Sequence, residues 1–173
     1  MESQIRILTA EDAVELFVLR RGALLDTPYA FLASPGDDLA ASEAAVHEML
    51  KRAPTSVVFG ACTPQLVGLL GLHRAHQVKA AHKVNLWGMY VAPAWRKRGV
   101  GEKLLGAAVS YARGLPGVST VRLSVSGSAS AARHLYEKVG FKIWGEEPDA
   151  MRIDGRPTIE HHMSLSLDDC SAA

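Results

Sequence analysis

The sequence predicts a mixed α/β domain built around a central sheet of about seven strands. Segments with the alternating pattern of strands are interleaved with segments whose apolar residues recur at helical spacing. Residues 84–125 follow the order strand, helix, strand, which predicts a right-handed parallel crossover. The chain of 173 residues is long enough for one sizeable core, so we expect a single domain over residues 1–167 and a frayed tail over residues 168–173.

The N-terminal part predicts a short strand at residues 4–8 and a helix after Thr9. Thr9 is typical of a helix N-cap, and Asp12 three residues later makes an imperfect capping box. The helix is expected to bury the aliphatic stem of Arg20 beside Ala13, Leu16, Phe17 and Leu24. A loop over residues 26–37 leads to a second helix from about residue 38 through 52. The apolar positions of the second helix are Leu39, Ala45, Val46, Met49 and Leu50.

The rest of the chain predicts six further strands and two further helices. The strands are expected at residues 56–62, 65–73, 84–91, 118–125, 141–145 and 158–167. One helix is expected from Gly99 to Gly114, and another from about Ser128 to a C-cap at Gly140. The pairs Thr63-Pro64 and Asp154-Gly155 favour hairpin turns.

The composition excludes several classes of protein. A net charge of +1 gives no electrostatic reason to expect a nucleic-acid or membrane partner. No apolar run reaches membrane-spanning length, and the N-terminal residues lack a signal-peptide pattern. Cys62 and Cys170 offer neither metal-ligand spacing nor a disulfide framework. We therefore expect a reduced, cytoplasmic protein without a bound metal.

The stretch from Val91 to Gly101 is the most informative part of the sequence. It joins the end of a predicted strand to a predicted helix, and it combines the cations Arg96-Lys97-Arg98 with Gly99 and Gly101. The first N–H groups of a helix have no intrahelical partner and carry partial positive charge. Glycines at such a start would let a bulky anion approach these donors, so the junction suits a pyrophosphate.

Two familiar nucleotide-binding motifs are excluded at this junction. A Rossmann fingerprint would need a third glycine where Leu104 stands, and a Walker A loop would need Gly-Lys-Ser/Thr where Gly101 precedes Glu102-Lys103. A tight turn beside solvated cations has the same composition. The segment alone leaves both interpretations open.

Two segments together resemble the GNAT superfamily of acyl-CoA-dependent N-acyltransferases. The strand at residues 86–93 followed by Arg96-x-x-Gly99-x-Gly101 is similar to the family's Arg/Gln-x-x-Gly-x-Gly/Ala signature. The segment 132–141, which contains Leu135-Tyr136-Glu137 and ends in Gly140-Phe141, is similar to its Leu-Tyr-Glu-x-x-Gly-Phe ending. The resemblance implies a mostly antiparallel sheet with helices on both faces. It also implies transfer of an acetyl group from acetyl-CoA to a primary amine.

The resemblance assigns most of the site. It implies that the pyrophosphate of acetyl-CoA lies on the signature loop and that the pantetheine arm pairs with the preceding strand. The cofactor-binding residues expected on this basis are Met89, Tyr90, Val91, Arg96, Lys97, Arg98, Gly99, Val100, Gly101 and Glu102. We expect a β-bulge near Gly88-Met89, because glycine in a strand often marks one. Tyr136 aligns with the family's proton donor to the departing thiolate.

The sequence departs from the family pattern at two places. Ala129 stands where many relatives have a cofactor-contacting Asn, and Ser128 or Ser130 is expected to serve only as a helix N-cap. Asn85 and Ser124 occupy the positions of the usual Glu base. The base is therefore open between an ordered water, a histidine such as His73, and none.

Some functional alternatives also stay open. A non-catalytic acyl-CoA-binding or sensing module is the main rival to an enzyme, and a nucleotide-binding regulator is a weaker one. Tyr29 and Phe31 fall in a loop that often lines the acceptor pocket in the family, although packing of the loop would also explain them. His161 and His162 are expected on opposite faces of a strand, which disfavours joint metal ligation. The sequence identifies neither the acceptor nor the oligomeric state, although a homodimer is common in the family.

Overall fold

The strands form one sheet in the order β1-β2-β3-β4-β5-β7-β6 in the computed structural model, which describes residues 2–168. They are β1 Gln4–Ile7, β2 Ser56–Cys62, β3 Leu66–Arg74, β4 Lys83–Val91, β5 Thr120–Ser126, β6 Lys142–Ile153 and β7 Arg156–Ser166. β4 and β5 are parallel, whereas every other neighbouring pair is antiparallel. The predicted mixed, mostly antiparallel sheet with one parallel unit is confirmed. The predicted tail, apart from Asp168, lies outside the described residues.

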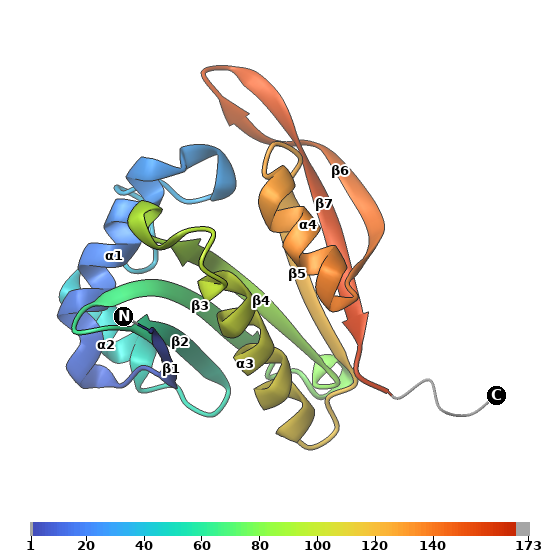
Figure 1. Cartoon of the computed structure of the whole chain (residues 1–173). Coiled ribbons are helices and arrows are strands. Elements are labelled where there is room, and N and C mark those ends of the chain that lie inside the picture. The colour runs from blue at the N-terminus through green and yellow to red at the C-terminus, as the bar shows by residue number, and fades with distance from the viewer. Residues whose placement is uncertain (1, 169–173) are drawn as a thin grey trace.

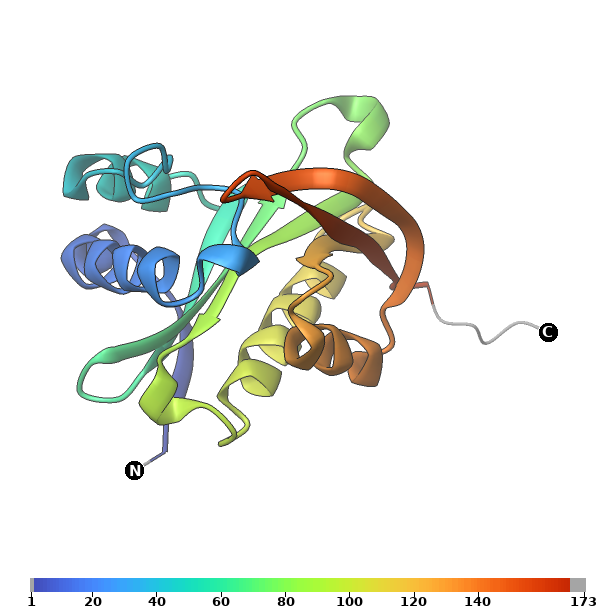
Figure 2. The same ribbon diagram turned by 90° about the horizontal axis from the view of Figure 1, so that it is seen from above.

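Helices cover both faces of this sheet (Figure 1 and Figure 2). α1 (Ala13–Asp26) and α2 (Glu43–Leu50) lie on one face, and α3 (Val100–Gly114) and α4 (Ser130–Val139) on the other. Short 3-10 turns connect the elements at η1 Ala10–Asp12, η2 Pro28–Ala30, η3 Val78–Ala80 and η4 Pro93–Trp95. No helix within residues 2–168 has the length and apolar content needed to cross a membrane.

The central strands are buried on both faces, so each contributes to two apolar cores. Along β2, Val57 and Phe59 point into the core under α3 and α4, whereas Val58 points into the core under α1 and α2. This alternation follows from the two-residue period of a strand. The sheet therefore separates two helical layers. The candidate site lies where its central strands β4 and β5 diverge.

The second helix is shorter than the sequence predicts. α2 begins at Glu43, because the Oγ of Ser42 caps it by accepting a hydrogen bond from the Ala45 N–H at 3.2 Å. Asp38 is not helical, and its carboxylate pairs with Arg20 of α1. Leu39, expected on the buried face, is 93% exposed. The predicted start at residue 38 was therefore five residues too early.

The last two strands form a longer hairpin than predicted. β6 extends to Ile153, and the turn at Asp154-Gly155 pairs it directly with β7 through Ile153 and Arg156. Both turn residues have positive φ angles of 50° and 75°. Positive φ at both central positions is typical of a type I′ turn, which suits the twist of a hairpin. The turn prediction is confirmed.

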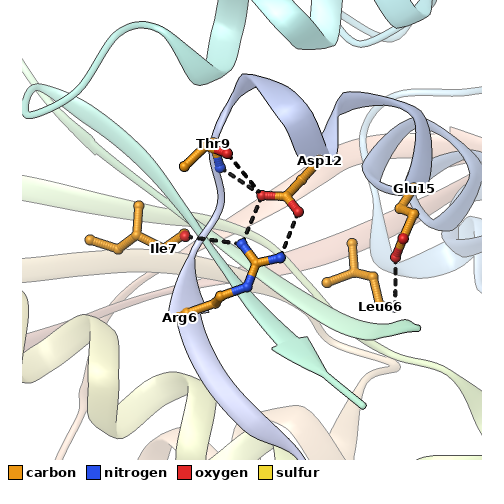
Figure 3. Close-up of polar contacts among 6 residues, drawn as sticks. All are labelled: Arg6, Ile7, Thr9, Asp12, Glu15 and Leu66. Atoms are coloured by element: carbon orange, nitrogen blue, oxygen red, sulfur yellow. Dashed lines mark hydrogen bonds and ion pairs between the residues drawn. The ribbon is translucent and has the colours of Figure 1, made fainter. Parts of the chain in front are cut away.

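The predicted capping box at the start of the first helix is present (Figure 3). The Thr9 N–H donates to the Asp12 Oδ2 at 2.8 Å, and the Arg6 guanidinium pairs with the same carboxylate at 2.6 and 2.7 Å. Hydrogen bonds from Arg6 and Thr9 lower the pKa of Asp12 to about 2. On the next turn, the Glu15 carboxylate accepts a hydrogen bond from the Leu66 N–H at 3.0 Å, which ties α1 to β3.

Candidate active site between the two central strands

β4 and β5 pair over only part of their length and then separate. Three residue pairs join them, from Lys83 opposite Thr120 to Asn85 opposite Arg122. Beyond Asn85, the remainder of β4 has no strand partner on its β5 side within the described residues. Figure 1 shows the two strands diverging toward the end of β4. A free strand edge at the centre of a sheet is able to pair with an extended ligand.

The open part of β4 contains the predicted bulge. Tyr90 is opposite Leu69 and Trp87 is opposite Gly71, so that two β4 residues, Gly88 and Met89, face one residue of β3. Gly88 has a φ of +69°, which favours glycine. The bulge also reverses the faces of the strand: Trp87 and Tyr90 both pack toward α1, and Met89 packs toward α3. The expected bulge near Gly88-Met89 is confirmed.

A cleft lies between the separated strands. Its walls come from both strands, from α4 and from the end of η2. The lining residues are Ala30, Phe31, Leu70, Leu86, Trp87, Gly88, Met89, Leu123, Ser124, Val125, Ser126, Ala129, Ala132 and Tyr136. Most of these side chains are apolar or small, so the cleft provides few polar groups that would hold water in place.

Tyr136 is the principal acid–base group in the cleft. It projects from α4, is 6% exposed, and makes an edge contact with Phe141 at a centroid distance of 5.9 Å. Burial raises the pKa of Tyr136 above its ordinary value near 10, so the phenol stays protonated at neutral pH. Its hydroxyl has no hydrogen-bond partner among residues 2–168. The proton of this phenol is therefore available to a bound molecule.

α4 begins without a side-chain cap. Its N-cap residue is Ala129, and Ser130 is already helical. The Ser128 Oγ lies 2.9 Å from the Ser126 Oγ instead of binding an α4 amide. The prediction that Ser128 or Ser130 caps this helix was therefore wrong. The Ser126 and Ser128 hydroxyls bind each other, and the small Ala129 side chain lies in the cleft wall.

The start of α3 has unpaired amides, as predicted. The Lys103 N–H makes the first intrahelical bond, to the Gly99 carbonyl at 3.0 Å, so the amides of Val100, Gly101 and Glu102 have no intrahelical acceptor. Different features of the structure favour glycine at positions 99 and 101. Gly99 has a φ of +75° and a Cβ there would meet open space, whereas a Cβ on Gly101 would lie 3.2 Å from Leu135. Gly101 therefore also allows close packing of α3 on α4, and the role of both glycines in the approach of an anion stays a prediction.

The cation cluster is divided among several partners. The Arg96 guanidinium pairs with Asp26 of α1 and donates from Nε to the Val91 carbonyl at 2.9 Å. Arg98 stacks on the ring of Trp95 at 5.2 Å. In the described part of the chain, the Lys97 side chain has no hydrogen bond or ion pair. Glu102 is paired with Lys138 at 2.9 Å.

A second pocket opens from the cleft toward α1 and α2. It has a volume of about 720 Å³, and six of its lining residues also line the cleft: Ala30, Phe31, Leu86, Trp87, Gly88 and Ser124. Its outer wall is formed by the loop after α1, by α2 and by β7. The remaining lining residues are Arg20, Leu32, Ala33, Asp37, Asp38, Leu39, Ala40, Met49, Arg52, Ser56, His73 and Glu160. A pocket of this size is in the ordinary range for a small molecule.

Comparisons with known proteins identify the family. The family model described as "Acetyltransferase (GNAT) family" matches residues 21–141, which is more than half of the chain. The chain belongs to the GNAT acetyltransferase family. It is therefore an acetyl-CoA-dependent N-acetyltransferase by family. A search of curated proteins finds no match.

Solved structures of other GNAT proteins share the fold. An acetyltransferase of the GNAT family from Streptococcus pneumoniae is 21% identical with a TM-score of 0.85, and the match covers 95% of this chain and 99% of that one. The putative acetyltransferase yncA from Salmonella typhimurium, solved with acetyl-CoA, is 20% identical with a TM-score of 0.82 over 100% and 98%. A ribosomal-protein-alanine N-acetyltransferase from Brucella melitensis is 23% identical with a TM-score of 0.81 over 95% and 99%.

The structure of this GNAT protein also places residues that sequence reasoning treated differently. Phe31 lines both the cleft and the second pocket, whereas Tyr29 is half exposed and lines neither. Ser124 lines both, and His73, one of the open alternatives for the base, lines the second pocket. Glu160 lines the second pocket although no sequence signal marked it.

Arg20 is the largest departure from expectation. Its stem was expected to be buried with the charged end in water, but the whole side chain is buried at 9% exposure and pairs with Asp38. A cation on the apolar face of a helix was the available signal, but its partner lies 18 residues away in a loop. This GNAT protein therefore keeps a buried ion pair in the wall of its second pocket.

The histidines of β7 do not form a joint site. His161 lies near Glu146 and Arg133, whereas the His162 Nε2 hydrogen-bonds to the Glu147 carboxylate at 2.9 Å and the His162 ring stacks on Trp144. Among the described residues, the one group with metal-ligand proximity is Glu147, Glu160 and His162.

Proposed function

We propose that this GNAT protein transfers the acetyl group of acetyl-CoA to a primary amine by direct attack of the neutral amine on the thioester. One observation carries the proposal: the open edge of β4, its bulge at Gly88 and the buried phenol of Tyr136 meet in a single cleft. The unpaired amides at the start of α3 follow the same strand in sequence. These are the parts that a thioester-cleaving site needs.

The chain would hold acetyl-CoA at two places. Backbone amides from Lys97 through Glu102 would bind the diphosphate, helped by the partial charge of the α3 start. The side chain of Lys97 is the cation of the cluster best able to join them, and Arg98 is exposed beside it. Met89, Tyr90 and Val91 would pair with the pantetheine arm as an added strand.

Arg96 contributes to this arrangement by a different route from a direct phosphate contact. Its pairing with Asp26 and with the Val91 carbonyl fastens the loop to α1 and to the end of β4. The Tyr90 hydroxyl binds the same Asp26 carboxylate at 3.2 Å. We propose that this cluster fixes the loop that presents the amides.

The reaction itself would use backbone donors and one phenol. The new bond joins the amine nitrogen to the thioester carbonyl carbon, and amides near Met89 and Tyr90 would stabilise the oxyanion by a factor typically of about 10²–10³ per donor. As the carbon–sulfur bond breaks, Tyr136 would donate its proton to the departing thiolate. The amine nitrogen loses one proton, so that reprotonation of Tyr136 leaves no net proton uptake. His73 and Glu160 are the potential bases in the lining of the second pocket that are neither paired with Arg20 nor hydrogen-bonded within the adjacent loop.

Release of coenzyme A, followed with a thiol reagent across a panel of primary amines, tests the proposal. We expect amine-dependent release above the rate of acetyl-CoA hydrolysis, with the acetylated amine detected by mass spectrometry. Binding of acetyl-CoA without release for any amine would instead support a non-catalytic acyl-CoA-binding module. Displacement of acetyl-CoA by simple nucleotides at similar concentrations would support the nucleotide-binding regulator.

A further inference from the structure

Arg20 has a hydrogen-bonding group that the protein does not use. Its Nε and Nη2 donate to the two Asp38 carboxylate oxygens at 3.0 and 3.1 Å, and both side chains are at least nine-tenths buried. The remaining nitrogen, Nη1, is buried and has no partner. A buried donor without an acceptor is unfavourable, because it has lost its hydrogen bonds to water without a replacement. Such a group indicates a position where a ligand atom is expected.

The surroundings of Nη1 belong to the second pocket. The Arg20 guanidinium lies over the Phe31 ring at 4.9 Å and near the Trp87 ring at 6.0 Å, and a Cβ added to Gly88 would lie 3.3 Å from Nη1. Phe31, Trp87 and Gly88 all line both the cleft and the second pocket. Arg20 therefore lies where the second pocket meets the β4 bulge, beside the expected position of the thioester.

We propose that the acceptor is an α-amino acid whose carboxylate is held by Nη1 of Arg20, an inference that rests on the proposed acetyl transfer to an amine. Nη1 provides N–H donors and no acceptor, so its partner is an oxygen of the ligand. Because Nη1 is beside the bulge, that oxygen lies close to the reacting nitrogen. An α-carboxylate is separated from its amine by a single carbon, which matches this closeness.

The rest of the pocket suits the same class of molecule. Glu160 supplies a negative charge for the incoming ammonium, and Arg52, which has no ion pair in the described chain, supplies a second positive charge. Leu86, Met49 and Phe31 provide apolar surface for a side chain.

The test compares three acceptors of one shape: L-leucine, L-leucinamide and 3-methylbutylamine. The kcat/KM of coenzyme A release is measured for each and expressed per concentration of free amine, because their amine pKa values differ. The wild-type protein should prefer L-leucine over both others by about 10- to 100-fold, the range expected of a charge-assisted hydrogen bond. Equal values for L-leucine and either analogue would overturn the proposal.

Two variants assign the preference to Arg20. Arg20→Lys keeps a positive charge for Asp38 but has no second nitrogen for the ligand. Arg20→Gln combined with Asp38→Asn removes both charges and so leaves no unpaired buried carboxylate. In either folded variant, kcat/KM for L-leucine should fall to that for 3-methylbutylamine, whose own value changes little. Arg21→Gln, on the exposed side of α1, is the matched control and should keep the full preference.

The outcomes separate this inference from the proposed function. Acetyl transfer to amines without any preference for a carboxylate would overturn the inference and leave the function in place. A preference that survives in folded Arg20→Lys would also overturn it. Failure of every amine to release coenzyme A, despite acetyl-CoA binding, would overturn the function and the inference together.

Discussion

Replacement of Tyr136 by phenylalanine separates a catalytic hydroxyl from a packing ring. The ring is buried and contacts Phe141, and phenylalanine keeps that contact. The hydroxyl makes no hydrogen bond within residues 2–168, so its removal leaves no partner unsatisfied. We therefore expect a change of less than about 0.5 kcal/mol in the free energy of unfolding, the ordinary range for a substitution that disturbs no contact.

Catalysis should respond very differently to the same substitution. Without the phenol, the thiolate leaves unprotonated, and we expect turnover to fall about 10²-fold, the lower end for general acid catalysis. Burial raises the pKa of Tyr136, but the same dry cleft also raises that of a departing thiolate, so proton transfer between them stays feasible. The raised pKa predicts no loss of the acid form between pH 7 and 10. Because ionisation is opposed in the folded state, stability should be lost only as the pH rises above 10, the ordinary value.

The assay combines urea unfolding with pre-steady-state acetyl transfer at saturating acetyl-CoA and amine. Tyr111→Phe is the control, because Tyr111 is on α3, away from the cleft lining, and its hydroxyl is 3.4 Å from the Pro54 carbonyl. Unchanged acetyl transfer in Tyr136→Phe, with chemistry shown to be the slow step, would refute the assignment. A large loss of stability would refute the reasoning about the unpartnered hydroxyl.

Three other substitutions follow from the described contacts. Asp12→Asn should lower the free energy of unfolding at pH 7 by about 1–2 kcal/mol in urea melts, a value reduced because Arg6 is partly exposed. Because the pKa of Asp12 is lowered in the folded protein, the wild type should lose the same stability as the pH falls from about 4 to about 2. Gly71→Ala would place a Cβ 2.0 Å from the Trp87 ring, so the ring must move and KM for the amine should rise more than KM for acetyl-CoA in steady-state assays. Gly99→Ala, at a φ of +75° but with open space around it, should be less stable by about 1–2 kcal/mol and should raise KM for acetyl-CoA selectively.

The fold was predictable because its signals are local and mutually consistent. The Thr9 cap, the Asp154-Gly155 turn and the bulge at Gly88 each depend on conformational preferences of a few neighbouring residues, and all are present. The start of α2 was missed for the opposite reason. Asp38 resembles a helix-starting residue, but its carboxylate is committed to Arg20, a partner on another helix that periodicity does not reveal.

For the candidate site, the positions of main-chain groups were easier to predict than the contacts of side chains. Main-chain groups at the start of α3 and along β4 follow from secondary structure, so a short motif is sufficient to place them. The ion pair of Arg96 could not be predicted in this way, because its carboxylate partner Asp26 lies 70 residues away in sequence. With Arg96 paired and Arg98 stacked on Trp95, few cations of the cluster are free for a diphosphate, which makes the amides its principal expected ligands. Arg20 also has a distant carboxylate partner, which its neighbouring sequence does not reveal. Its side chain is buried with the Nη1 donor unused, and the chemistry of that donor is the basis for the proposed acceptor.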